Sequence, residues 1–241
     1  MANAFASFTT EGMERQADTL GGGKTLLPTD VYKLHVKYAY SGESSGGALS
    51  ITVVGSVNGS DYSETFWITN KEKKNYFMSK NDKKVPLPGF TVIDDMCLFA
   101  TGKPLAQQST VDKIIEKYSP ETSSMQKSSV PVIEGLIDKD VLVAISQVKE
   151  FKRKKFDDGY HTVSDTTEFN EIEKVFHSDK HLTANEVINK VEEPAFYTKW
   201  LEAKKGKVKD KTKGKTPERP DATTSSGMPS AEPTPVSNPF A

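Results

Sequence analysis

Three segments in the first third of the chain alternate apolar and polar residues with the two-residue period of a β-strand, and this pattern constrains the fold most. They run over Asp30–Tyr40, Leu49–Val53 and Tyr62–Thr69, and the hairpin signal Asn58-Gly59 stands between the second and the third. Such alternation is typical of antiparallel strands that cover a core with one face. In the first segment the face expected to be core holds Tyr32, Leu34, Val36, Tyr38 and Tyr40.

One helix and two further strands are expected downstream. Phe90–Ala100 is an apolar stretch that favours a short buried helix, and Asp140–Phe151 contains a run of aliphatic residues typical of a strand. A glycine turn then predicts a hairpin whose second strand is Tyr160–Val163. Five strands with a helix between the third and the fourth match a small Greek-key barrel of the OB type.

The rest of the chain is expected to add helices to this barrel. We predict a helical piece at Val111–Tyr118, a capping box that opens a helix at Thr183, and a last helix from Pro194 to Gly206. From Thr167 onward the apolar residues follow a helical period. That stripe comprises Phe169, Ile172, Val175 and Phe176, and the last helix is expected to bury Phe196, Trp200 and Leu201.

The composition divides the chain into four parts. From Lys207 onward, alternating lysines followed by Pro, Thr and Ser cannot bury enough apolar surface to fold. The predicted organisation is a flexible N-terminal arm at 1–17, an OB-type domain at 18–166, a helical subdomain at 167–206 and a disordered tail at 207–241. The expected fold class is therefore mainly β with added α.

Charge is nearly balanced over the whole chain but not along it. The 241 residues carry 32 basic and 33 acidic side chains, for a net charge of −1. Residues 204–241 hold eight of the basic and four of the acidic side chains, so residues 1–203 carry 24 − 29 = −5. This balance excludes binding of a polyanion through bulk positive charge and requires a local basic patch.

Two lysine-rich clusters beside aromatic side chains supply such patches. The first extends from Lys71 to Lys84, directly after the strand that contains Trp67, and the second runs from Phe151 to Phe156. This combination is typical of proteins that hold a single nucleic-acid strand, because the cations meet phosphates and the rings stack on unpaired bases. With two lysines of the first strand, the candidate contacts are Lys33, Lys37, Trp67, Lys71, Lys73, Lys74, Tyr76, Phe77, Lys80, Lys83, Lys84, Phe151, Lys152, Arg153, Lys154 and Lys155.

Three of these assignments have a structural alternative. Trp67 is either a base platform or a packing residue. The face with Lys33 and Lys37 is either the working face of the sheet or a solvated outer face. The lysines of the first cluster are either phosphate contacts or charged residues of a sheet edge that prevent its pairing with another chain.

A metal-dependent nuclease is the competing class, and a protein-interaction module of the replication machinery is a third. The carboxylates available to a nuclease fall into no recognised metal spacing. They are Asp94 and Asp95, Asp157 and Asp158, and Glu171 and Glu173. We therefore expect no enzyme activity, no cofactor and no metal.

Three other motifs invite a chemical interpretation. His177 and His181 stand four residues apart, as zinc ligands do, but have no thiolate partner nearby. The segment Gly23-Lys24-Thr25 matches the end of a phosphate loop, yet Asp18 stands where that motif needs a glycine. Cys97 lies in an apolar run and is expected to be buried and inert.

The chain lacks sequence signals for a membrane. No apolar stretch approaches the ~20 residues of a membrane-spanning helix, and the first residues do not form a signal peptide. A cytoplasmic location is therefore expected.

A resemblance to a known family rests on eight short segments. They are Thr19–Gly23, Gly46–Ser50, Phe66–Thr69, Lys74–Phe77, Pro86–Phe90, Thr101–Lys103, Asn170–Ile172 and Phe176-His177. Together they resemble a family of bacteriophage single-stranded DNA-binding proteins, over roughly residues 18–206. The resemblance implies an OB-fold protein that coats single-stranded DNA during phage replication or recombination in the cytoplasm of the infected host cell. It also implies partners such as a phage polymerase, helicase or recombination protein; the segment Pro239-Phe240-Ala241 is a candidate docking peptide.

Overall fold

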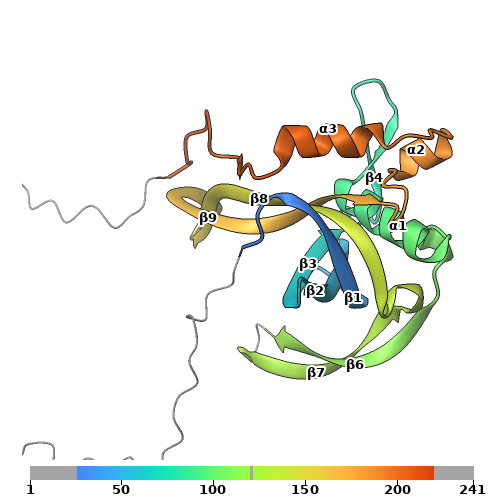
Figure 1. Cartoon of the computed structure of the whole chain (residues 1–241). Helices are drawn as coiled ribbons and strands as arrows, with labels where there is room; N and C mark the ends of the chain where they lie inside the picture. Colours follow the sequence, from blue (N-terminus) through green and yellow to red (C-terminus); the bar gives the residue numbers. More distant parts are fainter. Residues whose placement is uncertain (1–25, 120–121, 220–241) are drawn as a thin grey trace, which may run out of the picture.

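The computed structural model describes residues 26–119 and 122–219. The predicted N-terminal arm at 1–17, the segment Gly23-Lys24-Thr25 and the terminal Pro239-Phe240-Ala241 lie outside the described residues. In the part that is described, the protein is mainly β and is built on one large antiparallel sheet (Figure 1).

Five strands in the order β3-β2-β1-β8-β9 form the body of this sheet. The predicted strands and the predicted helix are all confirmed: β1 (Asp30–Glu43), β2 (Leu49–Val57), β3 (Ser60–Trp67), α1 (Pro88–Thr101), β8 (Lys139–Phe156) and β9 (Gly159–Phe176). The turn between β2 and β3 has positive φ angles at Asn58 and Gly59, as the hairpin signal requires. Helix α1 packs under the sheet, where Ile93, Met96 and Cys97 are fully buried.

Two hairpins are inserted on either side of α1. The first consists of β4 (Tyr76–Met78) and β5 (Lys84–Pro86), which form a separate two-stranded sheet. The second consists of β6 (Thr110–Ser119) and β7 (Ser124–Ile133), flanked by the short helices η1 (Leu105–Gln107) and η2 (Glu134–Leu136). The predicted helical piece at Val111–Tyr118 is therefore wrong. Val111, Ile114 and Ile115 are β-branched and favour a strand there, and pairing with β7 along the full strand outweighs the weak helical spacing.

The predicted helical stripe after Thr167 is also wrong, because β9 continues through the expected domain boundary at 166/167 to Phe176. A β-bulge at Glu173 places both Ile172 and Val175 in the core, and this spacing of three imitates a helix. Helix α2 (Ala184–Ile188) begins with the predicted capping box, in which Thr183 and Glu186 bond reciprocally. Helix α3 (Ala195–Lys204) buries Trp200 as predicted, whereas Phe196 is exposed, contrary to the prediction.

Part of the predicted disordered tail is docked on the sheet. Strand β10 (Lys209–Asp210) pairs in parallel with β8, and residues up to Arg219 follow the β8–β9 ribbon. The prediction of disorder from residue 207 is therefore wrong for residues 207–219. The physical reason is charge pairing, since Lys209 and Lys211 neutralise carboxylates of β9 that are distant from them along the chain.

A second β-bulge, between Val36 and Tyr38, decides which side chains of β1 face the core. Leu34, Val36 and Ala39 are fully buried, so the alternation changes phase across the bulge. As a result Tyr38 and Tyr40 lie on the outer face with Lys33, and the prediction that they are core residues of the barrel is wrong. They pack instead against the β6–β7 hairpin.

Gly55 permits the close approach of β2 to β1 at this bulge. A Cβ atom at position 55 would lie 2.2 Å from the His35 carbonyl oxygen, which is backbone and cannot move aside. We expect Gly55→Ala to destabilise the fold by roughly 1–3 kcal/mol, measured by chemical denaturation. Gly46→Ala is the control, because its Cβ would meet only the flexible Lys71 side chain at 3.4 Å. Equal stability of the two variants would contradict this account.

The sheet does not close into a barrel. Among the described strands no ladder joins β3 to β9, the two ends of the five-stranded order. One side chain bridges the gap: the Glu64 carboxylate of β3 accepts a hydrogen bond from the backbone N–H of Ile172 in β9 at 3.0 Å. We refer to the gap between β3 and β9 as the seam.

Candidate functional site

The outer face of β1, β2 and β3 carries the indole that the sequence singled out. Trp67 ends β3 opposite Ser50 of β2 and is 50% exposed. The next row across the three strands is Tyr40, Thr52 and Thr65, and the two threonine hydroxyls lie 2.9 Å apart. Trp67 therefore lies at the edge of a polar, open face and not in the core, as its strand phase predicted.

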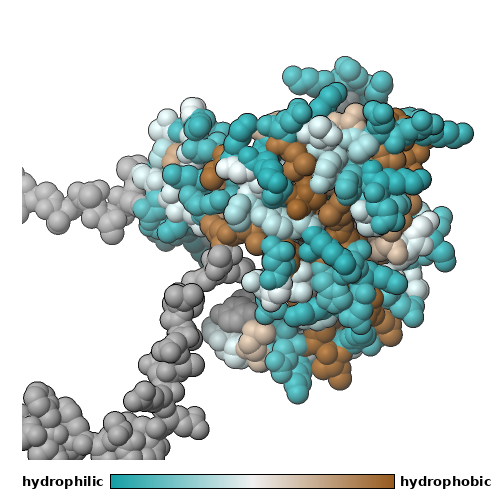
Figure 2. All heavy atoms as spheres, viewed as in Figure 1, coloured by the Kyte–Doolittle hydropathy of each residue, from teal (hydrophilic) through white to brown (hydrophobic). Residues whose placement is uncertain are grey.

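The first basic cluster lies at the same end of the sheet as Trp67. The backbone of Asn70 starts the loop that leads to β4, and Lys73 forms a 3.2 Å ion pair with Glu43 at the end of β1. At the top of Figure 1 the β4–β5 hairpin projects beside α1, and Figure 2 shows mainly hydrophilic side chains at that position. Phe77 is exposed on this hairpin, and the Lys84 ammonium lies 4.7 Å from the Tyr76 ring centroid. Lysines and aromatic faces therefore occur together here.

Several predicted phosphate contacts are already paired with carboxylates. Lys33 meets Asp140 at 2.6 Å, Lys37 meets Asp61 at 2.8 Å, and Lys74 meets Glu72 at 2.6 Å. All three pairs are exposed, and exposed pairs contribute only about 0.2–1 kcal/mol, so a phosphate can replace the carboxylate. Lys71, Lys80 and Lys83 form no ion pair with any described residue. They are the lysines of this cluster most available to an anion.

The second basic cluster lies elsewhere. Ile145 of β8 pairs with Asp30 at the start of β1, and Phe151–Phe156 continues beyond it, away from the Trp67 end. In Figure 1 the tip of the β8–β9 ribbon and the β4–β5 hairpin occupy opposite sides of the molecule. The structure thus does not bring the two clusters into the one groove that the sequence analysis expected.

The tip of the β8–β9 ribbon has one open and one covered face. Lys152, Arg153, Lys154 and Lys155 are exposed, and Phe151 and Phe156 are half-buried. The Arg219 guanidinium covers the Phe156 ring at 4.8 Å, and Glu218 contacts His161. Tyr160, directly opposite Lys155, is 60% exposed and is an aromatic that sequence reasoning missed. Its position next to a predicted turn was the available signal.

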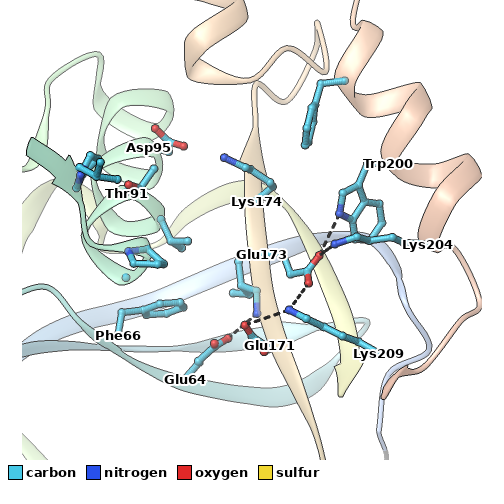
Figure 3. A pocket seen from close by; sticks show the side chains of 17 residues that line it. Glu64, Phe66, Thr91, Asp95, Glu171, Glu173, Lys174, Trp200, Lys204 and Lys209 are labelled. Carbon is cyan, nitrogen blue, oxygen red and sulfur yellow. Dashed lines mark hydrogen bonds and ion pairs between the residues drawn. The ribbon is translucent and has the colours of Figure 1, made fainter. Parts of the chain in front are cut away.

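A pocket of about 650 Å³ opens at the seam between β3, α1, β9 and α3 (Figure 3). Its charges are largely paired with one another. Glu173 accepts hydrogen bonds from Trp200 Nε1, Lys204 and Lys209. Burial alone would raise the pKa of Glu173, but the two ammonium groups lower it to about 2.

Two other carboxyl groups of this pocket have a raised pKa, in contrast to Glu173. Burial raises the pKa of Glu64 to about 7, against the hydrogen bonds that Tyr62 and Ile172 donate to it. Burial likewise raises the pKa of Asp95 to about 6, although Lys174 opposes the shift. Asp95 was named from the sequence only as one of the carboxylates available to a nuclease, and Glu64 was not singled out. The signal for Glu64 was its phase with Tyr62 and Phe66 on an otherwise apolar face.

The remaining chemical motifs do not form sites in the described part of the chain. His177 Nδ1 accepts hydrogen bonds from the backbone N–H groups of Asp179 and Lys180, so it caps a turn. Within residues 26–119 and 122–219, no three His, Cys, Asp or Glu side chains gather as metal ligands. Cys97 is fully buried, and burial raises the pKa of its thiol to about 12, as its apolar run predicted.

Comparison with known proteins identifies no relative: no family model, curated protein or solved structure matches this chain. None of the helices in the described residues is both long and apolar enough to span a membrane.

Proposed function

We propose that this protein binds single-stranded DNA without sequence specificity and protects it during phage replication or recombination, in the cytoplasm of the infected host cell. The observation that carries the proposal is the placement of Trp67. Its indole is half-exposed on a polar strand face, at the same end of the sheet as the first basic cluster, in which Lys71, Lys80 and Lys83 form no ion pair with a described carboxylate. The segment resemblance to phage single-stranded DNA-binding proteins supports the same conclusion.

The sheet is compatible with an open barrel of the OB type. The strand order β3-β2-β1-β8-β9, with a helix between β3 and β8, is the order expected for such a barrel before its last pair of edges closes. In this proposal the binding face is the outer face of β1, β2 and β3. Trp67 and the β4–β5 hairpin flank it at one end.

The binding mechanism in this proposal is passive and needs no cofactor. A base stacks on the Trp67 indole, and the lysines of the β4–β5 hairpin neutralise phosphates and release counterions. Exposed Phe77 offers a further ring for stacking. Duplex DNA binds weakly, because its bases are already stacked in pairs and cannot reach the indole.

Intrinsic fluorescence tests the proposal directly, because the chain has two tryptophans in opposite environments. Trp200 is 4% exposed and Trp67 is 50% exposed. Titration with an oligo(dT) strand at low salt is expected to quench the Trp67 emission and leave the Trp200 emission unchanged, and a duplex of equal length is expected to quench little. The Trp67→Phe variant separates the two signals. Absence of quenching and of any gel shift with oligo(dT) would contradict the proposal.

We expect the lysines of the first basic cluster that form no ion pair with a described residue to set the salt dependence of binding. Each lost phosphate contact reduces the slope of log K against log salt by about 0.7 on a single strand. The triple variant Lys71→Ala, Lys80→Ala, Lys83→Ala should therefore flatten the slope by about 2, measured by fluorescence polarisation of a labelled oligonucleotide. Lys190→Ala, just after α2 and outside both basic clusters, should leave it unchanged. An unaltered slope in the triple variant would place the phosphate path elsewhere.

A protein-interaction module is the second candidate, and an exposed apolar patch favours it. Val187 and Ile188 of α2, with Val191 and Phe196, present aliphatic and aromatic surface to solvent. In this proposal the patch binds a replication partner such as a phage polymerase, helicase or recombination protein. Failure of the wild-type protein to bind any oligonucleotide at low salt, together with unchanged folding, would favour this role over DNA binding.

A further inference from the structure

We infer that the β6–β7 hairpin forms one wall of the nucleic-acid site, with Lys113 and Lys117 as its phosphate contacts. The inference rests on the proposed single-strand binding and adds residues to that site. Neither lysine belongs to the two basic clusters of the sequence. The segment Val111–Tyr118 was expected to be helical, so the sequence did not predict that both lysines share one face of a strand.

The hairpin joins the rest of the sheet near its base. The single ladder pair between β7 and β1 is Val132 with Tyr40. Ile115, Val130 and Val132 pack there against Tyr38 and Tyr40, the two tyrosines that the bulge in β1 turns outward. From that contact the hairpin arches past the outer face of β1, β2 and β3 (Figure 1). Tyr38 and Tyr40 thus form the floor of the proposed site beside this hairpin.

Strand alternation fixes which side chains of the hairpin face this floor. Ile115 and Val130 are buried against the tyrosines, so residues in phase with them share the inner face. That phase contains Lys113 opposite Val130 and Lys117 opposite Gln126. The other phase, which faces away, contains Asp112, Glu116 and Lys127.

The two faces of the hairpin therefore differ in charge. Counting strand residues only, the inner face carries two lysines and no carboxylate, for +2, and the outer face carries one lysine and two carboxylates, for −1. Neither Lys113 nor Lys117 forms an ion pair with a side chain in the described ranges. Folding does not require that lysines and carboxylates lie on different faces at these exposed positions. The separation presents the two lysines to the face that holds Thr52, Thr65 and Trp67.

The dimensions fit a single strand. Trp67 lies two strands across and two residues along from Tyr40, which separates their Cα atoms by roughly 12 Å. A strand that stacks a base on Trp67 can therefore run over the tyrosine floor with its phosphates toward the lysine wall. A single strand is the occupant that meets these features together, since it offers phosphates to the lysines and unpaired bases to the rings.

The test compares lysines on the two faces of the same hairpin. We expect the double variant Lys113→Ala, Lys117→Ala to reduce the slope of log K against log salt for oligo(dT) by about 1.4, at about 0.7 for each lost phosphate contact. With equal binding of the two proteins at 1 M salt, the double variant should bind roughly 25-fold more weakly than the wild type at 0.1 M salt. Lys127→Ala, on the outer face, should leave slope and affinity unchanged. Wild-type binding with an unaltered double variant would overturn this inference alone, whereas absence of wild-type binding would overturn the proposed function with it.

A second measurement does not depend on affinity. Cys97 is fully buried, so a cysteine introduced at an exposed position reacts alone with a thiol reagent. Oligo(dT) should slow the labelling of Lys117→Cys and leave that of Lys127→Cys unchanged. Equal labelling rates with and without oligo(dT) at both positions, under conditions where the wild type is saturated, would overturn the inference.

Discussion

Replacing Trp67 by alanine should weaken binding of single-stranded DNA by roughly 5- to 150-fold, because a stacked base contributes about 1–3 kcal/mol. The fold should persist, since the indole is half-exposed at the end of β3 and fills no cavity. Fluorescence polarisation of a labelled oligo(dT) strand measures the affinity without relying on the missing tryptophan.

Two further variants at this position identify the interaction. Trp67→Phe keeps a flat π-face and should retain most of the affinity, whereas Trp67→Leu keeps apolar area without a ring and should behave like alanine. Tyr160→Ala, a similarly exposed aromatic at the far tip of the β8–β9 ribbon, shows whether that ribbon also stacks bases. Full affinity in a folded Trp67→Ala protein would remove Trp67 from the site.

The strands themselves could be predicted because each covers the core with one face. Leu34 and Val36 of β1, and Tyr62 and Phe66 of β3, follow a period of two. The same reasoning placed Trp67 outside. The alternation of apolar and polar residues does not show where a bulge occurs. A bulge adds one residue to the strand, so the core-facing and outer positions exchange beyond it. Tyr38 and Tyr40 were therefore assigned to the core, although they lie on the outer face.

A bulge also explains one of the two wrongly predicted helices. In β9, a bulge puts Ile172 and Val175 on the same side with a spacing of three, which a single sequence cannot distinguish from a helix turn. For β6, the positions of Val111, Ile114 and Ile115 fit a helix as well as a strand, and only pairing with β7 decides. The separation of the two basic clusters was likewise invisible, because it depends on how far β8 extends past the start of β1.

Glu64 makes the stability of this protein depend on pH. The carboxyl group is buried at the seam, where it accepts hydrogen bonds from the Tyr62 hydroxyl at 2.6 Å and from the Ile172 N–H at 3.0 Å. Burial nevertheless raises its pKa from 4.5 to about 7. The folded protein thus holds the Glu64 proton more tightly than the unfolded chain does.

The sign of the pH dependence follows from that difference. Below pH 4.5 the group is protonated in both states, and its contribution is at its most favourable. As the pH rises from 4.5 to about 7, the unfolded chain releases the proton first, so the free energy of unfolding falls by roughly 3 kcal/mol in total. Urea denaturation at intervals between pH 4.5 and pH 8 measures this decline.

Glu64→Gln should remove most of this decline, because the amide retains an acceptor for Ile172 and has no charge to bury. At pH 8 the variant should be more stable than the wild-type protein. Asp95→Asn is the comparison, since the buried Asp95 carboxyl titrates in the same direction, with a pKa of about 6, and leaves the Glu64 contribution in place. If the free energy of unfolding of the Glu64→Gln protein fell with rising pH as steeply as that of the wild type, Glu64 would not be the group responsible for the pH dependence. The contact between β3 and β9 would then owe its strength to the surrounding apolar side chains.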